Sequence, residues 1–132
     1  LPISTDYALA KAVKWGASVI LSVPCCQHEL NRQIENKVLA PVLEYGILKE
    51  RFSAILTDAL RAQMLQSAGY DTQILEFIDM EHTPKNLLIR AVKSDKTKNE
   101  DTKKQQREAW ERCAEEFHVT PSLKKLLFDS ID

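Results

Sequence analysis

The sequence lacks a CxxC pair, an excess of either charge and an apolar run long enough to cross a membrane. Its three cysteines are Cys25, Cys26 and Cys113, an odd number of which two are adjacent. A bridge between neighbouring cysteines is strained, and zinc needs ligands that converge tetrahedrally, so both disulfide-stapled and structural zinc domains are disfavoured. We therefore expect no bound metal. Because the sequence also shows no signal peptide and no membrane-spanning run, we expect free thiols, no membrane and a cytoplasmic location.

The charge balance gives no global reason to bind nucleic acid. There are 18 basic and 19 acidic side chains, with a net charge of -1, so an RNA partner would need a local basic patch. Apolar residues make up 44% and charged residues 28% of the 132 residues, which is typical of one globular domain. The sequence opens on LPISTDYALA without an initiator Met, and we expect it to be a piece of a longer polypeptide.

The chain opens on patterns of a helix and then a strand. Capping residues and apolar positions at helical spacing predict a helix from about Asp6 to Trp15, with Gly16 as its stop. The run ASVILSVP is apolar without alternation, which is typical of a strand covered on both faces. We therefore predict a central parallel strand at Val19 to Val23 and an α/β sheet.

Helical patterns fill the middle of the chain. The stretch HELNRQIENKVLAPVLEYG predicts a short helix and then a second helical turn from Pro41 to Gly46. The stretch ILKERFSAILTDALRAQMLQSAG predicts a long amphipathic helix that ends at Gly69 and packs on the sheet. The predicted apolar stripe of this helix consists of Leu48, Phe52, Ile55, Ala59 and Ala62.

The last third predicts a hairpin followed by helices. YDTQILEFIDM and NLLIRAVK have strand patterns, and the six residues EHTPKN between them are too few for a parallel crossover, so these strands are antiparallel. The run from Lys93 to Glu108 has no large apolar residue and predicts a solvated linker into a polar helix start. We assign residues 1–93 to one region and 94–132 to a second, which has two helices, the last capped by Thr120 with Pro121 first.

Three strings carry a resemblance to a known family: TDYALAKAVKWGASVILSVPCCQHELN, ERFSAILTDALRAQMLQSAG and YDTQILEFIDMEHTPKNLLIRAV. Over residues 5–93 they resemble the C-terminal half of Rossmann-like S-adenosylmethionine-dependent methyltransferases, in a bacterial subgroup with a PCCQHEL motif. The resemblance implies one parallel strand plus a terminal antiparallel hairpin packed with helices, followed by C-terminal helices. It also relates the chain to a broader set suspected of acting on RNA.

The same resemblance implies that most of the cofactor site belongs to residues that this sequence does not contain. The family holds S-adenosylmethionine with a glycine-rich loop and an acidic residue, whereas the glycines here are Gly16, Gly46 and Gly69, without a cluster. Where the family reads His-Ala-Cys-Asp before a Thr-Asp pair, this chain reads LPIS before Thr5 and Asp6. The resemblance implies cofactor contact at Thr5 and Asp6, and a chain that is the substrate side of the enzyme and is inactive alone.

The loop PCCQH follows the carboxyl end of the first predicted strand, where open α/β sheets bind ligands. If the strand through Ile74 runs the same way, EHTPKN leaves the sheet at the same edge and the two loops converge. We then expect His28 to accept a proton from the methyl acceptor, because imidazole titrates near neutral pH. The predicted substrate-binding residues are Cys25, Cys26, Gln27, His82, Lys85 and Asn86.

Several of these residues also have a plainer interpretation. Cys25 or Cys26 can be a small buried apolar side chain, and Cys113 is expected to pack in this way. His82 ties the hairpin turn as readily as it contacts a substrate. Lys85 and Asn86 are turn residues first and contacts to phosphate or base second.

The long helix and the two tryptophans carry further candidates. Arg51, Asp58 and Arg61 lie close to one face of the helix, and we expect Asp58 and Arg61 to form a surface ion pair of little energetic weight, with a role at the cleft rim secondary. We expect Trp15 and Trp110 to pack in the core or between helices rather than to stack on bases.

A non-catalytic RNA- or protein-binding domain is the competing function. It would present the basic positions of the linker and the hairpin, while metal or thiol chemistry through Cys-Cys-His ranks third. A sheet that lacks its other half leaves the strand at Val19 to Val23 without a neighbour on one side, so we also expect homo-oligomers through this exposed edge.

Overall fold

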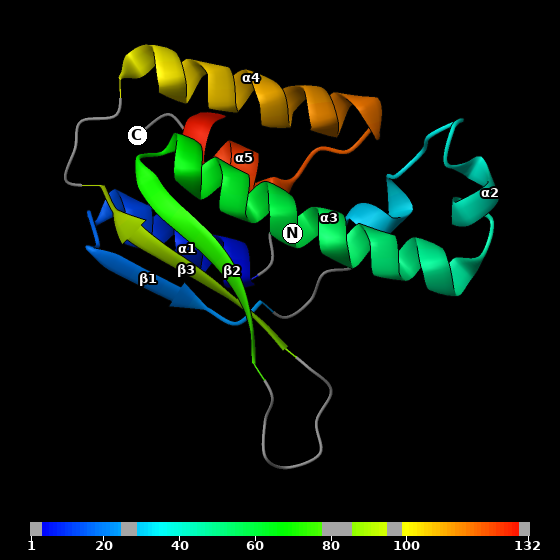
Figure 1. Cartoon of the computed structure of the whole chain (residues 1–132), viewed down its shortest axis with the longest axis horizontal. Coiled ribbons are helices and arrows are strands. Elements are labelled where there is room, and N and C mark those ends of the chain that lie inside the picture. Colours follow the sequence, from blue (N-terminus) through cyan, green and yellow to red (C-terminus); the bar gives the residue numbers. More distant parts are fainter. Residues whose placement is uncertain (1–3, 25–28, 78–85, 95–98, 130–132) are drawn as a thin grey trace.

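The computed structural model describes residues 4–24, 29–77, 86–94 and 99–129 of the chain. This part is an α/β structure with five α-helices and one three-stranded sheet (Figure 1), so the predicted α/β class is confirmed. The elements are α1 (Ser4–Lys14), β1 (Val19–Ser22), the 3-10 turn η1 (Glu29–Arg32), α2 (Ala40–Leu43), α3 (Gly46–Ser67), β2 (Tyr70–Phe77), β3 (Asn86–Lys93), α4 (Glu100–Glu116), α5 (Ser122–Lys124) and the π-helical η2 (Lys125–Asp129).

The sheet has the strand order β1-β3-β2, and β3 is antiparallel to both neighbours. The predicted antiparallel hairpin is confirmed, and β1 and β2 run in the same direction on either side of β3. The prediction of a central parallel strand is wrong for the described sheet, where β1 is an edge strand with one antiparallel partner. An uncharged apolar run fits an edge strand as well as a central one, and the sequence alone does not separate the two.

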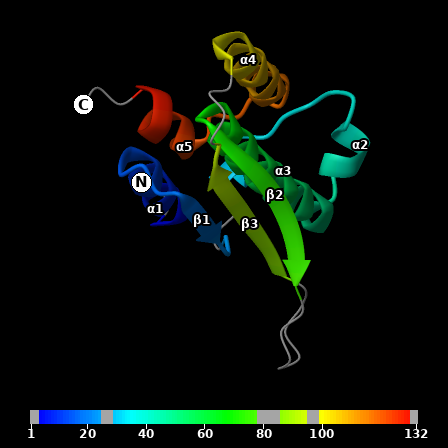
Figure 2. The ribbon, with the colours of Figure 1, turned by 60° about the vertical axis from the view of Figure 1, so that its left-hand side comes forward.

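Helices cover only one face of the described sheet (Figure 2). Ile20, Ile89 and Ala91 share this face and are buried in the core beside residues of α1 and α3. On the other face Val19 and Leu21 are 53% and 62% exposed. The prediction that this strand is covered on both faces is therefore wrong in the described structure, because its apolar residues on the open face lie against no helix there.

The core lies between the covered face and the helices and also includes side chains from the C-terminal helices. Trp110 of α4 is buried and donates its indole N–H to Ser67 Oγ at 3.1 Å, which confirms its predicted packing role. Trp15 is 75% exposed, so its predicted packing is wrong. It lies just after α1, where Lys11 Nζ is 5.4 Å from the centre of its ring.

The long helix α3 is confirmed, but its predicted apolar stripe is partly wrong. Ala62 is buried and Phe52 packs partly buried against the core, whereas Leu48 and Ile55 are exposed. The buried face includes polar side chains that bond within the structure, which a count of apolar positions does not detect. Buried polar residues of α3 are Ser53, Thr57, Asp58, Arg61 and Ser67.

The C-terminal region is tied to the segment around η1. Glu29 Oε1 accepts hydrogen bonds from the backbone N–H (3.0 Å) and the hydroxyl of Ser122, and Gln33 Oε1 accepts one from the backbone N–H of Thr120 at 2.6 Å. Pro121 is the N-cap of α5, in place of the predicted Thr120. No side-chain hydrogen bond caps this helix.

Candidate functional site

The strands β1 and β2 run in the same direction, so their carboxyl ends lie at the same end of the sheet. β1 ends at Ser22, opposite Ile89, and β2 continues past this level to Phe77, opposite Asn86, with β3 between them. A tight turn at Gly16, with a φ of 69°, reverses the chain between α1 and β1, so the N-terminal turn of α1 lies toward this end too (Figure 1). The predicted acceptor site required the strand through Ile74 to run in the same direction as the strand at Val19 to Val23, and these two strands do so.

Most of the predicted acceptor residues fall outside the described residues. These are Cys25, Cys26, Gln27, His28, His82 and Lys85. Asn86 is the first residue of β3, and its backbone lies opposite Phe77 in the strand register. The predicted contact of these residues with a substrate stays a prediction.

The turn η1, which follows the cysteine loop in sequence, is fixed to α3. Leu30 of η1 is fully buried, and the hydroxyl of Ser53 donates to Asn31 Oδ1 at 3.3 Å. On the other side of the loop, Ser22 lies opposite Ile89 in the sheet. The described residues on either side of the two cysteines are thus held on β1 and on α3.

A buried ion cluster joins α1 to α3 near this end of the sheet. Arg61 Nε donates to Asp6 Oδ1 at 2.9 Å, and Arg61 Nη1 donates to Asp58 Oδ1 at 3.3 Å. All three side chains are at most 3% exposed, so the prediction of a surface pair between Asp58 and Arg61 is wrong. The spacing of three residues on one helix was visible in the sequence, but the partner 55 residues away was not.

The cluster has two carboxylates around one guanidinium. Burial of charged groups costs several kcal/mol for each ion, and partners offset this cost only where the geometry is good. Arg61 Nη2 is buried and has no hydrogen-bond partner in the described structure, so the guanidinium is not fully satisfied there. In such a cluster, removal of one partner costs more free energy than the intact cluster adds in net stability.

Thr5 and Asp6, the predicted cofactor contacts, lie in the first turn of α1 and are buried. One of the carboxylate oxygens of Asp6 accepts a hydrogen bond from Arg61. The predicted contact of Thr5 and Asp6 with S-adenosylmethionine stays a prediction.

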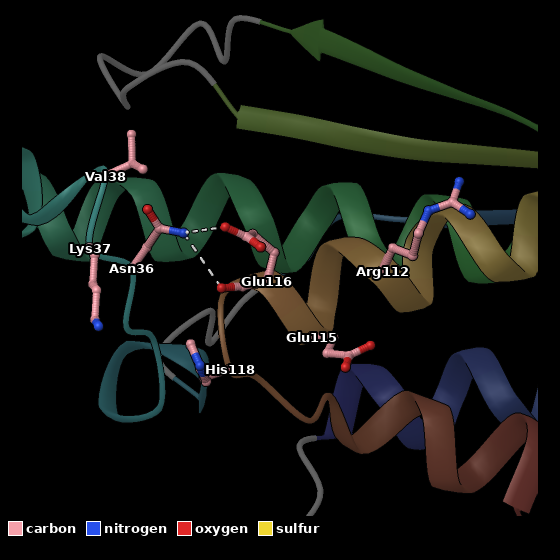
Figure 3. A pocket seen from close by; sticks show the side chains of 7 residues that line it. All are labelled: Asn36, Lys37, Val38, Arg112, Glu115, Glu116 and His118. Carbon is pink, nitrogen blue, oxygen red and sulfur yellow. Dashed lines mark hydrogen bonds between the residues drawn. The ribbon is translucent and has the colours of Figure 1, made fainter.

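A separate cavity of about 540 Å³ lies between the segment after η1 and the end of α4 (Figure 3). Asn36 Nδ2 donates to the carboxylate of Glu116 at 3.1 Å and to its carbonyl oxygen at 3.5 Å. His118 has a φ of 59°, and its Nδ1 lies 2.9 Å from the carbonyl oxygen of Glu35. These polar groups bind each other and join two segments, so they form a structural junction rather than a site for chemistry.

Cys113 fits its predicted packing role. It is partly buried against the core, and this burial raises the pKa of its thiol, which disfavours the reactive thiolate. Among the described residues, no group of three His, Cys, Asp or Glu side chains is placed to hold a metal ion. Within the same residues, no helix combines the length and apolar character needed to cross a membrane.

A scan of protein-family models, a search of curated proteins and a search of solved structures each gave no match to this chain.

Proposed function

We propose that these residues form the acceptor side of a Rossmann-like S-adenosylmethionine-dependent methyltransferase that acts on RNA in the cytoplasm. The observation that carries the proposal is the strand arrangement, in which β1 and β2 share a direction and β3 is reversed beside both. A parallel sheet that closes with an antiparallel hairpin has this arrangement. It supports the proposal because the PCCQH and EHTPKN loops then begin at one edge, where such sheets bind ligands.

The open edge of β1 gives a second support. Within the described sheet no strand lies beyond β1, and its side chains Val19 and Leu21 are exposed on the open face. A larger sheet that holds the cofactor would continue from this edge. The buried Asp6 and Arg61 would then keep the N-terminal turn of α1 in place beside the junction of the two parts.

The chemistry proposed for this chain is proton transfer. S-adenosylmethionine supplies the methyl group when bound, and His28 accepts the proton that the acceptor nitrogen or oxygen loses. Cys25, Cys26, Gln27, His82, Lys85 and Asn86 surround the acceptor in this proposal. Because Thr5 and Asp6 are turned into the core, no step of the reaction is assigned to them.

The test uses the natural polypeptide that contains these residues, with methyl-labelled S-adenosylmethionine and total RNA. We expect His28→Ala to lower turnover by about 10² to 10⁴ fold, since a positioned proton acceptor contributes this much. His118→Ala is the matched control. His118 lies just after α4, outside the two predicted loops, where its ring contacts the Glu35 carbonyl oxygen, so this change should keep wild-type turnover even if it lowers stability slightly. Unchanged turnover in His28→Ala would remove this residue from the site, and transfer of label to no RNA would contradict the proposed acceptor.

The competing candidate is a protein-binding domain without catalysis. The open face of the sheet favours it, since Leu21, Leu75 and Phe77 are exposed apolar side chains of that face. Under this alternative the natural polypeptide transfers no label, and lysine substitutions on the open face weaken capture of a protein partner while His28→Ala does not.

A further inference from the structure

The two edges of the described sheet carry different side chains. The strand β2, at one edge, includes Asp71 and Glu76. The strand β1, at the other edge, lies in a stretch from Ala17 to Pro24 that has no charged residue. Charged side chains on an edge strand hinder pairing with another chain, and β1 lacks this protection.

The strand register shows which backbone groups of β1 point outward. The backbone N–H of Lys93 donates to the carbonyl oxygen of Ser18 at 2.8 Å, which makes these two residues a hydrogen-bonded pair. Such pairs alternate along antiparallel strands, so Ile20 and Ser22 also direct their backbone groups to β3. The backbone N–H and C=O groups of Val19 and Leu21 therefore point away from β3. If the same alternation continues past the end of β1, those of Val23 do so as well.

The same outward-bonding residues carry exposed apolar side chains. Val19, Leu21 and Val23 are 53%, 62% and 53% exposed. They alternate along the strand and so share the open face of the sheet. The edge therefore offers backbone donors and acceptors together with a row of apolar side chains.

We propose that β1 pairs in antiparallel fashion with β1 of a second copy of this chain, with Leu21 opposite Leu21 of the second copy. In this register Val19 lies opposite Val23 of the second copy, and every outward-bonding residue meets another one. About six inter-strand hydrogen bonds can form, and the two apolar rows join on one face. The proposal does not depend on methyl transfer and applies to the 132-residue chain. In a longer polypeptide, a larger sheet that continues from β1 would occupy the same edge, so the two occupants exclude each other.

A second copy is the occupant because the edge is complementary to itself. Two-fold contacts need the same patch to fit its own copy, and a strand without charge does so without repulsion. The central residue of the register, Leu21, is also the most exposed of the three apolar residues. Because the paired strands are short, the interface is small, and we expect a weak dimer with a Kd of about 10 to 500 µM.

Sedimentation equilibrium of the 132-residue chain, from about 10 µM to about 1 mM, tests the pairing. We expect Leu21→Lys to raise the dimer Kd at least about tenfold, because two lysines would then lie directly opposite each other. Leu75→Lys is the matched control: Leu75 is exposed on the same open face, but its backbone lies opposite Leu88 inside the sheet. This control should dimerise as the wild type does.

Amide hydrogen exchange supplies a readout that does not depend on a variant folding well. In the wild-type chain, exchange of the amides of Val19 and Leu21 should slow as the concentration rises, whereas that of Ile20, already bonded to β3, should not. A wild-type monomer at about 1 mM overturns the proposal. It is equally overturned if Leu75→Lys weakens association as much as Leu21→Lys, since association would then occur through the open face and not through the edge.

Discussion

The two faces of the sheet carry similar apolar side chains but contribute very differently to the core. On the covered face Ile20 and Ile89 are almost inaccessible, while on the open face Leu21 and Leu75 keep about half of their surface in water. Residue type does not separate the faces. The difference lies in the placement of α1 and α3, which pack on one side and are joined by the buried ion cluster.

The largest expected effect breaks the covered face at its buried charge. Arg61→Met leaves Asp6 and Asp58 buried without their cation, and we expect the free energy of unfolding to fall by about 3 to 5 kcal/mol. Urea unfolding followed by circular dichroism measures this. Arg51→Met, an exposed position on the same helix, is the control and should change stability by less than about 0.5 kcal/mol.

A loss below about 1 kcal/mol for Arg61→Met would mean that the cluster is solvated and does not anchor α1. The triple variant with Asp6→Asn and Asp58→Asn separates charge from packing. It should recover part of the loss, because neutral amides tolerate burial without a cation better than carboxylates do.

The second prediction compares the two faces directly. Ile89→Ala removes a fully buried side chain of the central strand and should cost about 2 to 5 kcal/mol. Leu75→Ala on the open face should cost under about 1 kcal/mol, because its side chain is already in contact with water. Equal losses in the two variants, measured by the same urea titration, would show that the open face is covered in solution.

Local patterns predicted most of the elements, but the linker predicted as far as Glu108 is wrong from Glu100 on, because α4 begins there as a polar helix. The sheet order needed more than local patterns. The helix before β1, the long α3 and the antiparallel hairpin follow from periodicity, a glycine stop and a short connection. The edge position of β1 does not, because ASVILSVP is uncharged and apolar on both of its faces. Strand order depends on contacts between distant segments, and these leave no periodic signal in one strand.

The candidate site shows the same limit. The shared direction of β1 and β2 places the starts of the PCCQH and EHTPKN loops at one end of the sheet, as predicted. Most residues of these loops lie outside the described part of the chain. The cluster at Arg61 was interpreted as a surface pair because i,i+3 ion pairs are usually exposed. Its burial depends on Asp6. Sequence patterns placed Asp6 at the start of a helix, and the resemblance to the methyltransferase family implied that it contacts a cofactor.

The third prediction concerns the contact between the covered core and α4. Ser67→Ala removes the acceptor of the buried Trp110 N–H, and we expect a loss of about 1 to 3 kcal/mol, the cost of one unsatisfied buried donor. Thermal unfolding measured by tryptophan fluorescence reports it. Ser67→Thr, which keeps the hydroxyl, should lose less, and equal losses would attribute the effect to packing alone.

The smallest effect lies at the margin of the covered face, where the Tyr70 hydroxyl donates to the carbonyl oxygen of Ala17 at 2.7 Å. Tyr70→Phe removes this hydrogen bond and should cost about 1 kcal/mol near pH 7. Burial raises the pKa of Tyr70 above 10.0, so the folded chain keeps a proton that the unfolded chain has lost. The stabilisation is therefore complete below pH 10 and is lost as the pH rises through the folded-state pKa.

The difference in stability between the wild type and Tyr70→Phe should accordingly shrink above pH 10, because only the wild type loses this contribution. Urea titrations of both chains at pH 8 and above pH 10 measure the change, and any effect of the partly buried Cys113 thiol is common to both and cancels. Tyr45→Phe, at an exposed tyrosine, is the control and should match the wild type near neutral pH. A gap that stays constant or widens with pH would mean that the Tyr70 hydroxyl ionises as readily in the folded chain as in the unfolded one, and that this margin of the covered face is open to water.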